Sequence, residues 1–382
     1  MNGELQARLT AEIQDHVRAG TNHLSDEEFY NPVTSYASAT RSESERDRLF
    51  RRYPIVAGHA SRLSQPGAFL TYDVAGLPIV VVRDGDGAVS AFLNVCRHRG
   101  AKVVEAAHGV TRRLTCPYHS WSYDLKGGLA VIPDESAFCG VDRDQRGLVE
   151  LPTEVRHGLV WVLLEGEDLD VASYLGPLDD ELASFGLDAY VEERLDSLRT
   201  NVNWKLVVDG FLEAYHLPFL HSQTIGPYIR QKPTMFEPFG IHGRMVAVRK
   251  SFERHVDADP VDVDLLPHIA IIYQLFPNTI LVWQADHFEM WNCFPDGPDP
   301  GQSLSRASLL APDAQQAAER TDYWDSNWKV LMNTVEQEDF RVARTMQAGY
   351  SSGAQSHVVF GRNEPALQHF HRNLADLLAS QS

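Results

Sequence analysis

Residues 96–119 read CRHRGAKVVEAAHGVTRRLTCPYH, and this stretch contains two Cys-His pairs. Cys96 and His98 form the first pair, and Cys116 and His119 form the second, with seventeen residues between His98 and Cys116. Two thiolates and two neutral imidazoles make a complete ligand set for a soft or borderline metal. A single Cys or His usually only packs, but four of them at this spacing predict a metal site.

The order of these ligands separates two kinds of metal site. Zinc fingers usually place two Cys in one loop and two His in another. Here each loop supplies one Cys and one His, which suits a [2Fe–2S] centre in which one iron takes both Cys and the other takes both His. A structural zinc module in a non-redox binding protein is the alternative.

Short β-strands are expected on both sides of the metal-binding stretch. Segments rich in β-branched and aromatic residues recur from residue 53 to residue 165, separated in places by Gly-bearing turns at 84–87 and 126–128. The predicted strands are AFLTYDV, PIVVVRD, AVSAFLNV, RLTCPYHSWSYD and LVWVLLE. We predict a small, mostly antiparallel β domain over residues 53–165.

The rest of the chain favours an α+β fold. Residues 1–52 are expected to be mainly helical and to pack on a larger domain over residues 166–382. A helical region is expected to reach Leu217, because the strand signals stop after residue 169. The further predicted strands lie near 243–252, 268–276, 279–284, 287–295 and 304–310, and helices near 313–348 and 365–378. Blocks of this kind favour an antiparallel sheet over βαβ units.

The overall charge excludes some function classes. The 382 residues contain 34 basic and 52 acidic side chains, a formal net charge of −18. Such a chain is poorly suited to nucleic acid or to anionic membranes. The sequence shows neither a signal peptide nor a membrane-spanning run, so we expect a cytoplasmic protein.

A second group of ionisable side chains lies in FLEAYHLPFLH, residues 211–221. Asn203 is placed to cap a helix that reads WKLVVDGFLEAYH. Asp209, Glu213 and His216 form a polar seam at i, i+4 and i+7 of that helix, whose other faces are apolar. Because unpaired charges are costly inside a protein, the seam predicts either metal ligation or a salt-bridge network.

His221 follows His216 by five residues, which is about 140° around an unbroken helix. Two imidazoles at that angle cannot share a metal. Pro218 is expected to end the helix at about Leu217 and to let the chain bring His221 back. With that break, both imidazoles are predicted to face one metal.

The third ligand is expected to come from the predicted helix over 313–348. Its apolar face carries Trp324, Trp328, Leu331, Val335, Val342 and Met346. Asp339 falls on the same face, whereas Glu336 and Glu338 are predicted to project elsewhere. Two His and one Asp would form a facial triad that leaves positions on Fe(II) open.

Together these motifs resemble the terminal oxygenase (α) component of the Rieske non-heme iron oxygenases, the ring-hydroxylating family. The shared motifs are C-x-H…C-x-x-H, N-W-K at 203–205, E-x-Y-H-x4-H at 213–221, and E-D at 338–339 followed by Gln347. Arg344 stands where a second acid is common. The resemblance covers residues 53–348 and implies a Rieske domain followed by a catalytic domain with a helix-grip antiparallel sheet.

The resemblance also implies roles for single residues. The ligands of a Rieske [2Fe–2S] cluster are matched by Cys96, His98, Cys116 and His119. The ligands of a mononuclear Fe(II) are matched by His216, His221 and Asp339. Glu213 matches the acid that links the iron site to the cluster of a neighbouring subunit, by a hydrogen bond to His119 of that subunit.

The partners implied by the resemblance are a flavin reductase, with or without a ferredoxin, and further copies of the chain in a homotrimer or in an α3β3 hexamer with a small β subunit. Five basic residues and one acid lie close to the Cys/His set: Arg97, Arg99, Lys102, Arg112, Arg113 and Glu105. This basic island is a candidate docking site for an acidic electron carrier. Ordinary solvated loop charge is an equal alternative.

The implied reaction is hydroxylation of an aromatic or similar small organic substrate with O2. Ring-dihydroxylating members mostly carry Asp where this chain has Glu213, and Asp209 replaces a common Asn. These departures leave open a monooxygenase or demethylase that acts on a quaternary ammonium or an N- or O-methyl compound. Candidate pocket residues, each more often simply core, are Phe211, Met235, Phe236, Phe239, His242, Phe288 and Trp291.

Overall fold

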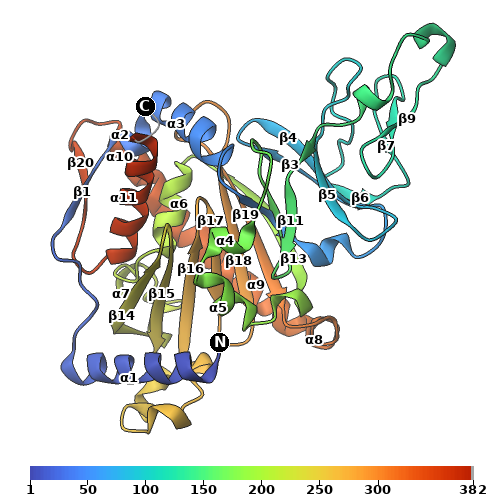
Figure 1. Ribbon diagram of the computed structural model, residues 1–382. Helices are drawn as coiled ribbons and strands as arrows, with labels where there is room; N and C mark the ends of the chain where they lie inside the picture. Colours follow the sequence, from blue (N-terminus) through green and yellow to red (C-terminus); the bar gives the residue numbers. More distant parts are fainter. Residues whose placement is uncertain (380–382) are drawn as a thin grey trace. The chain divides into compact units, whose positions relative to one another are not determined.

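The computed structural model describes residues 1–379, and the chain forms two compact units (Figure 1). The smaller unit consists of residues 50–171. The larger unit combines residues 1–49 with the chain from residue 172 onward. No helix among residues 1–379 is both long enough and apolar enough to cross a membrane.

The smaller unit is the predicted antiparallel β domain. One sheet has the strand order β10-β5-β4-β3-β6, and two three-stranded sheets have the orders β11-β12-β2 and β7-β8-β9. The strands are β2 (Ile55–His59), β3 (Ala68–Val74), β4 (Leu77–Arg83), β5 (Val89–Leu93), β6 (His108–Val110), β7 (Leu114–Thr115), β8 (Ser122–Tyr123), β9 (Leu129–Val131), β10 (Glu150–Leu151), β11 (Thr153–Arg156) and β12 (Leu159–Val162).

The larger unit contains the predicted antiparallel sheet, with the strand order β13-β19-β18-β17-β16-β15-β14. The strands are β13 (Val191–Thr200), β14 (Ile229–Phe239), β15 (His242–Arg249), β16 (Ile269–Leu275), β17 (Thr279–Trp283), β18 (Phe288–Pro295) and β19 (Ser303–Ala311). Every residue of β16, β17 and β18 is buried, as expected for strands that are covered on both faces.

Helices and one two-stranded ribbon complete the larger unit. β1 (Phe29–Pro32) pairs with β20 (His357–Phe360). The helices that flank the sheet are α1 (Gly3–Ala19), α2 (Thr34–Ala37), α3 (Ala39–Glu45), α4 (Val171–Leu175), α5 (Leu178–Ala183), α6 (Trp204–Phe211), α7 (Leu217–Leu220), α8 (Ala314–Glu319), α9 (Thr321–Thr334), α10 (Phe340–Tyr350) and α11 (Pro365–Ala379). α6 packs on β18 and β19, and α11 packs on β14 and β15 (Figure 1). Both helices are thereby held against the sheet.

The sequence did not predict two of the sheet's strands. β13 lies inside the region expected to be helical, and β14 contains Pro233 and Pro238. Both are the edge strands of the sheet, and both are only partly buried. An edge strand tolerates charge and proline, because one side of its backbone has no strand to pair with. Its sequence therefore lacks the apolar alternation that identifies a central strand.

The helix predicted over residues 313–348 is interrupted. α8 ends before Arg320, and α9 and α10 are joined by a π-helical segment, η10 (Val335–Asp339). A π-helix has a wider turn than an α-helix, so side chains after its start shift around the axis. This segment contains Glu338 and Asp339, and the shift decides where both carboxylates point.

Candidate active site

The Cys/His set occupies two loops of the smaller unit. Cys96 and His98 follow β5, and Cys116 and His119 lie between β7 and β8. Both thiols are buried in one apolar cluster. The ring centroids of the two histidines are 4.7 Å apart, and the His98 ring stacks on Trp121 at 4.8 Å.

Local turns hold the first loop in shape. Gly100 adopts a positive φ of 84° and donates its N–H to the carbonyl of Cys96 at 2.9 Å. Glycine takes this left-handed conformation without steric cost. Tyr123 adds a side-chain contact, because its hydroxyl accepts a hydrogen bond from the N–H of Arg97 at 2.8 Å and lies 3.4 Å from the Sγ of Cys96.

The set fits a two-iron cluster better than a single zinc ion. A zinc ion would bring all four ligand atoms within about 4 Å of one another, given bonds of about 2.0–2.3 Å. Among residues 1–379, no three of these four side chains are found with all their ligand atoms within 4.8 Å. In addition, Nδ1 of His98 is buried without a hydrogen-bond partner in the described chain. An unsatisfied buried nitrogen of this kind suits a metal ligand.

Protonation in this region also fits metal binding. Burial lowers the pKa of His98, and the neighbouring His119 lowers it further, which favours the neutral imidazole that binds metals. Burial raises the pKa of the Cys116 thiol, and so does the neighbouring thiol of Cys96. Thiolates at this position therefore need a positive partner such as iron.

A second group of ligand atoms converges in the larger unit. The ligand atoms of His216, His221 and Asp339 all lie within 4.8 Å of one another. The two Nε2 atoms are 3.1 Å apart, and Oδ1 of Asp339 lies 3.0 Å from Nε2 of His221 and 3.7 Å from Nε2 of His216. Metal bonds of about 2.1 Å that meet at right angles would separate two ligand atoms by about 3.0 Å. The geometry therefore fits one metal ion.

The backbone brings the two histidines together in an unexpected way. Pro218 was predicted to end the first helix at Leu217, but α6 already ends at Phe211. Gly210 in its last turn is a poor helix former. Pro218 instead lies in the first turn of α7, with His216 at the cap before this helix and His221 directly after it. Proline suits the first turn of a helix, where its missing N–H is not needed.

Each of these imidazoles has a carboxylate on its other nitrogen. Nδ1 of His216 bonds to Glu213, whose second oxygen accepts the backbone N–H of His216 at 3.0 Å. Nδ1 of His221 bonds to Glu338 at 2.5 Å, and Thr224 donates its hydroxyl to the same carboxylate oxygen at 2.8 Å. With Nδ1 donating, both Nε2 lone pairs face the same point, which is the arrangement typical of metal-binding histidines.

The prediction that Glu338 projects elsewhere was therefore wrong. The helical wheel assumed a regular α-helix, whereas η10 places Glu338 beside His221 and Asp339 beside both imidazoles. Burial acts to lower the pKa of His221, but hydrogen bonds that His221 donates to Asp339 and Glu338 outweigh burial, so the pKa is raised. Burial acts to raise the pKa of Glu338, and the bonds from His221 and Thr224 lower it on balance.

Asp209 does not join this triad. Its carboxylate accepts hydrogen bonds from the Tyr36 hydroxyl at 2.5 Å and from Nε2 of His371 at 2.8 Å. Tyr36 and His371 belong to α2 and α11, so the polar seam expected on one helix divides in two. Asp209 connects α6 to α2 and α11 through hydrogen bonds. Only Glu213 and His216, which follow Phe211, lie at the triad.

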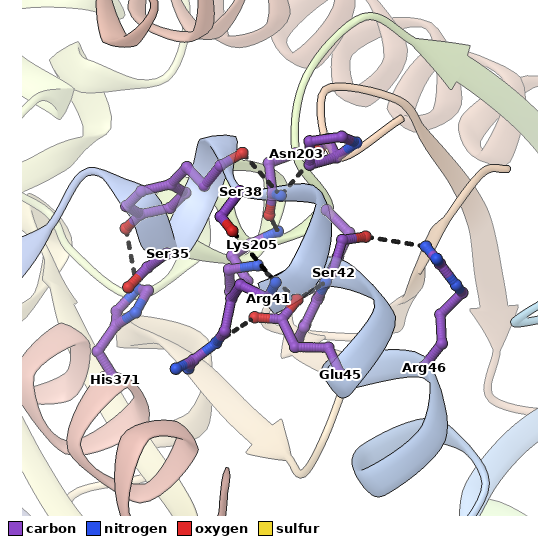
Figure 2. Close-up of polar contacts among 12 residues, drawn as sticks. Ser35, Ser38, Arg41, Ser42, Glu45, Arg46, Asn203, Lys205 and His371 are labelled. Carbon is purple, nitrogen blue, oxygen red and sulfur yellow. Dashed lines mark hydrogen bonds and ion pairs between the residues drawn. The ribbon is translucent and has the colours of Figure 1, made fainter. Parts of the chain in front are cut away.

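A buried ion pair anchors the start of α6 (Figure 2). Nζ of Lys205 lies 2.7 Å from Oε2 of Glu45, and both side chains are 1% exposed. Trp204 donates its indole N–H to the same oxygen at 3.0 Å, and Arg41 bonds to the other oxygen at 3.0 Å. The pair couples α6 to α3, and removing Glu45 would leave the buried Lys205 ammonium without its carboxylate partner.

A cavity of about 260 Å³ opens beside the triad. Its lining includes His216 and Asp339, and among residues 1–379 that line it there is no Lys or Arg. Four carboxylates contribute, from Asp209, Glu213, Asp339 and Glu364. Five aromatic rings contribute, from Tyr36, Phe211, Phe340, Tyr350 and Phe360. The cavity is thus acidic and aromatic.

Of the candidate pocket residues, only Phe211 lines this cavity. Trp291 packs behind it, with ring centroids 5.2 Å apart. His242 is buried and hydrogen-bonded to backbone groups of Tyr174 and Phe276. Glu364 and Tyr350 could not be identified from a sequence motif, because they join the site only through the packing of α10 and α11.

Comparisons with known proteins identify the family of this chain. The family model of the ring hydroxylating alpha subunit (catalytic domain) matches residues 187–380, and that of the Rieske [2Fe-2S] domain matches residues 53–152. The glycine betaine monooxygenase oxygenase subunit of Chromohalobacter salexigens is 26% identical over 372 residues, which covers 87% of this chain and 80% of the relative.

Two other relatives match over about half of each chain. The carnitine monooxygenase oxygenase subunit of Escherichia coli K12 is 31% identical over 194 residues, covering 48% of this chain and 50% of the relative. The biphenyl 2,3-dioxygenase subunit alpha of Rhodococcus jostii is 31% identical over 217 residues, covering 54% and 45%. Substrate classes therefore differ among the relatives.

Solved structures share the fold. The quaternary ammonium Rieske monooxygenase CntA in complex with L-carnitine has a TM-score of 0.77 at 20% identity, covering 92% of this chain and 96% of that one. Naphthalene 1,2-dioxygenase from Rhodococcus sp. bound to indole has a TM-score of 0.74 at 18% identity, covering 98% of both. Together with the two family matches, these findings show that the chain belongs to the Rieske non-heme iron oxygenases, as an alpha subunit of the ring-hydroxylating family.

Proposed function

We propose that this oxygenase oxidises a quaternary ammonium compound at the metal triad. The family implies a Rieske [2Fe–2S] cluster and a catalytic mononuclear iron. We assign the cluster to Cys96, His98, Cys116 and His119, and the iron to His216, His221 and Asp339. When bound, the iron supplies the chemistry that activates O2, and the cluster supplies electrons.

The observation that carries the proposal is the composition of the cavity. Its lining combines acidic side chains with aromatic rings and lacks Lys and Arg among the described residues. Carboxylates attract a cation, and the faces of aromatic rings attract a quaternary ammonium group. A cavity of about 260 Å³ is small, which suits a compact ammonium compound. Glycine betaine and carnitine, named for two relatives, both carry such a group.

The residues of this chain then have distinct tasks. Glu213 and Glu338 hold the two imidazoles so that both Nε2 atoms face the same point. The apolar wall of the cavity excludes water from the reacting carbon. In the overall reaction, one oxygen atom of O2 enters a C–H bond of the substrate. The other leaves as water, with two electrons from the reductase and two protons from solvent.

Hydroxylation of a neutral aromatic substrate, the main expectation from the sequence, is the second candidate. The biphenyl dioxygenase relative and the naphthalene dioxygenase structure favour it. A neutral ring, however, offers nothing to offset the acidic groups of the cavity. The ammonium compound is therefore the better match.

The test is turnover with a surrogate reductase and NADH, in which O2 uptake is compared with product formed. We expect oxidation of trimethylammonium compounds, detected by mass spectrometry as a gain of one oxygen atom or as loss of a methyl group with release of formaldehyde. Biphenyl and naphthalene serve as neutral comparison substrates. Product from the neutral arenes alone would overturn the proposal.

An oxygenase subunit implies a separate reductase. We further propose that the reductase is a flavoprotein, with or without a ferredoxin, that the chain forms a homotrimer, and that Glu213 links the iron site to His119 of the adjacent subunit.

Mixed oligomers test this arrangement. Cys116→Ser removes the cluster and Asp339→Ala removes the iron site, so each variant alone should be inactive. Activity of the co-assembled variants would require electrons to cross between subunits. Continued inactivity of proven mixed oligomers would contradict electron transfer between subunits.

A further inference from the structure

Glu364 contributes a carboxylate to the wall of the cavity. It precedes α11, and its Oε2 accepts a hydrogen bond from the N–H of Gly361 at 2.5 Å. No ion pair to this carboxylate is found within residues 1–379. A partly buried carboxylate with no counter-ion costs free energy. The structure therefore leaves a negative charge facing the cavity that a ligand can offset.

The charge of the surroundings strengthens this point. Burial is the main cause that raises the pKa of Glu364 to about 6, and the negative charges of Glu213 and Asp209 raise it further. The four carboxylates of the lining also exceed the two charges of a bound ferrous ion by two. Even with the metal in place, the cavity attracts cations and repels anions.

Repulsion of anions matters for the choice among ammonium compounds. Glycine betaine and carnitine each carry a carboxylate besides the ammonium group. A buried substrate carboxylate needs a cationic partner as well as hydrogen bonds, and the described lining offers no Lys or Arg for this purpose. A cation that lacks a carboxylate meets no such penalty.

Tyr350 supplies a second polar group of the cavity that needs a ligand. This tyrosine is 7% exposed, and its hydroxyl has no hydrogen-bond partner in the described chain. Its ring stacks with that of Tyr36 at a centroid distance of 5.2 Å. The neighbouring Tyr36 hydroxyl donates its hydrogen to Asp209, so it is not used by Tyr350. The Tyr350 hydroxyl can therefore bond to a neutral polar group, such as a hydroxyl, on a bound molecule.

We propose, on the basis of the function proposed above, that Glu364 recognises the ammonium group and that the substrate is an ammonium alcohol or similar cation without a carboxylate. Tyr350 binds the neutral polar end of this molecule. Glu364 thereby determines specificity and takes no part in the reaction at the metal.

Binding to the iron-loaded protein under anaerobic conditions tests this proposal without a reductase. Isothermal titration calorimetry would compare choline, its neutral isostere 3,3-dimethylbutan-1-ol, and glycine betaine. We expect choline to bind at least about 10-fold more tightly than either, the equivalent of one charge-assisted contact. Glu364→Gln should remove most of the preference for choline over the isostere, whereas Glu43→Gln, at an exposed position outside the cavity, should leave it unchanged.

Tyr350→Phe provides the second test. It should weaken the binding of choline several-fold and leave tetramethylammonium, which has no hydroxyl, unaffected. Tighter binding of glycine betaine than of choline would overturn this inference and leave the ammonium function standing. Equal binding of choline and its neutral isostere, or no binding of any ammonium compound at millimolar concentration, would overturn both.

Discussion

The Cys/His loops and the His/Asp triad hold their imidazoles by different means. His98 stacks on Trp121, and its buried Nδ1 has no partner among residues 1–379. His216 and His221 instead each bond through Nδ1 to a carboxylate. An anionic partner raises the basicity of a metal-binding imidazole. The comparison indicates that apolar packing shapes the cluster site, whereas partly buried carboxylates tune the iron site.

Removing one ligand from each region gives the largest expected effects. Asp339→Ala should lower the iron content from about three to about two atoms per chain and reduce turnover by at least about 1,000-fold. Cys116→Ser should remove the cluster iron and leave the triad intact. Metal analysis and the EPR signal of the reduced cluster check both variants. A full cluster signal in Asp339→Ala would show that the regions are loaded independently, and loss of that signal would contradict the comparison.

Changing the carboxylates that support the triad should have a smaller effect. Glu213→Gln and Glu338→Gln should each weaken iron affinity about 10- to 100-fold, because each removes the anionic partner of one imidazole. Excess iron should restore most of the turnover of Glu338→Gln. Glu213→Gln should stay slow even when loaded with iron, since we also assign it to electron transfer between subunits. Equal recovery of the two variants would remove that second role.

The ionised Glu364 should lower the free energy of unfolding, whereas Glu213 and Glu338 each have a histidine as a hydrogen-bond partner. Burial and neighbouring charge raise its pKa to about 6, so the folded state disfavours the ionised form. The penalty is fully present above pH 6 and disappears as pH falls below the unfolded value of about 4.5. Glu364→Gln should therefore stabilise the protein by about 1–2 kcal/mol at pH 7.5 and by nearly nothing at pH 4.5. Calorimetry after chelation of the triad metal measures both values, and equal stabilisation at the two pH values would contradict the assignment.

The smallest effect is expected on the surface beside the cluster. Lys102 is already paired with Asp73 at 2.9 Å, whereas Arg112 and Arg113 are exposed. Replacing both arginines by Glu should slow reduction of the cluster by an acidic carrier several-fold and flatten its dependence on salt. Stopped-flow reduction at several ionic strengths measures this rate. An unchanged rate would show that these arginines are ordinary solvated charges.

The sequence determined the features whose parts are neighbours in the chain. Both Cys-His pairs lie within 24 residues, and His216 and His221 lie within one motif. Their spacing is therefore visible without the fold. The central strands could be predicted for a similar reason, because burial on both faces forces a continuous apolar run. Edge strands β13 and β14 carry no such constraint and were missed.

Only the tertiary structure decided the position of Glu338 and the composition of the cavity. A regular helical wheel cannot represent η10, whose wider turn brings Glu338 to His221. The cavity draws Tyr36, Tyr350 and Glu364 from segments that are far apart in the chain. No local pattern records that these side chains meet. Long-range packing brings an unpaired carboxylate and an unsatisfied hydroxyl to one wall, and their energetic cost becomes apparent only once the neighbours that could offset it are known.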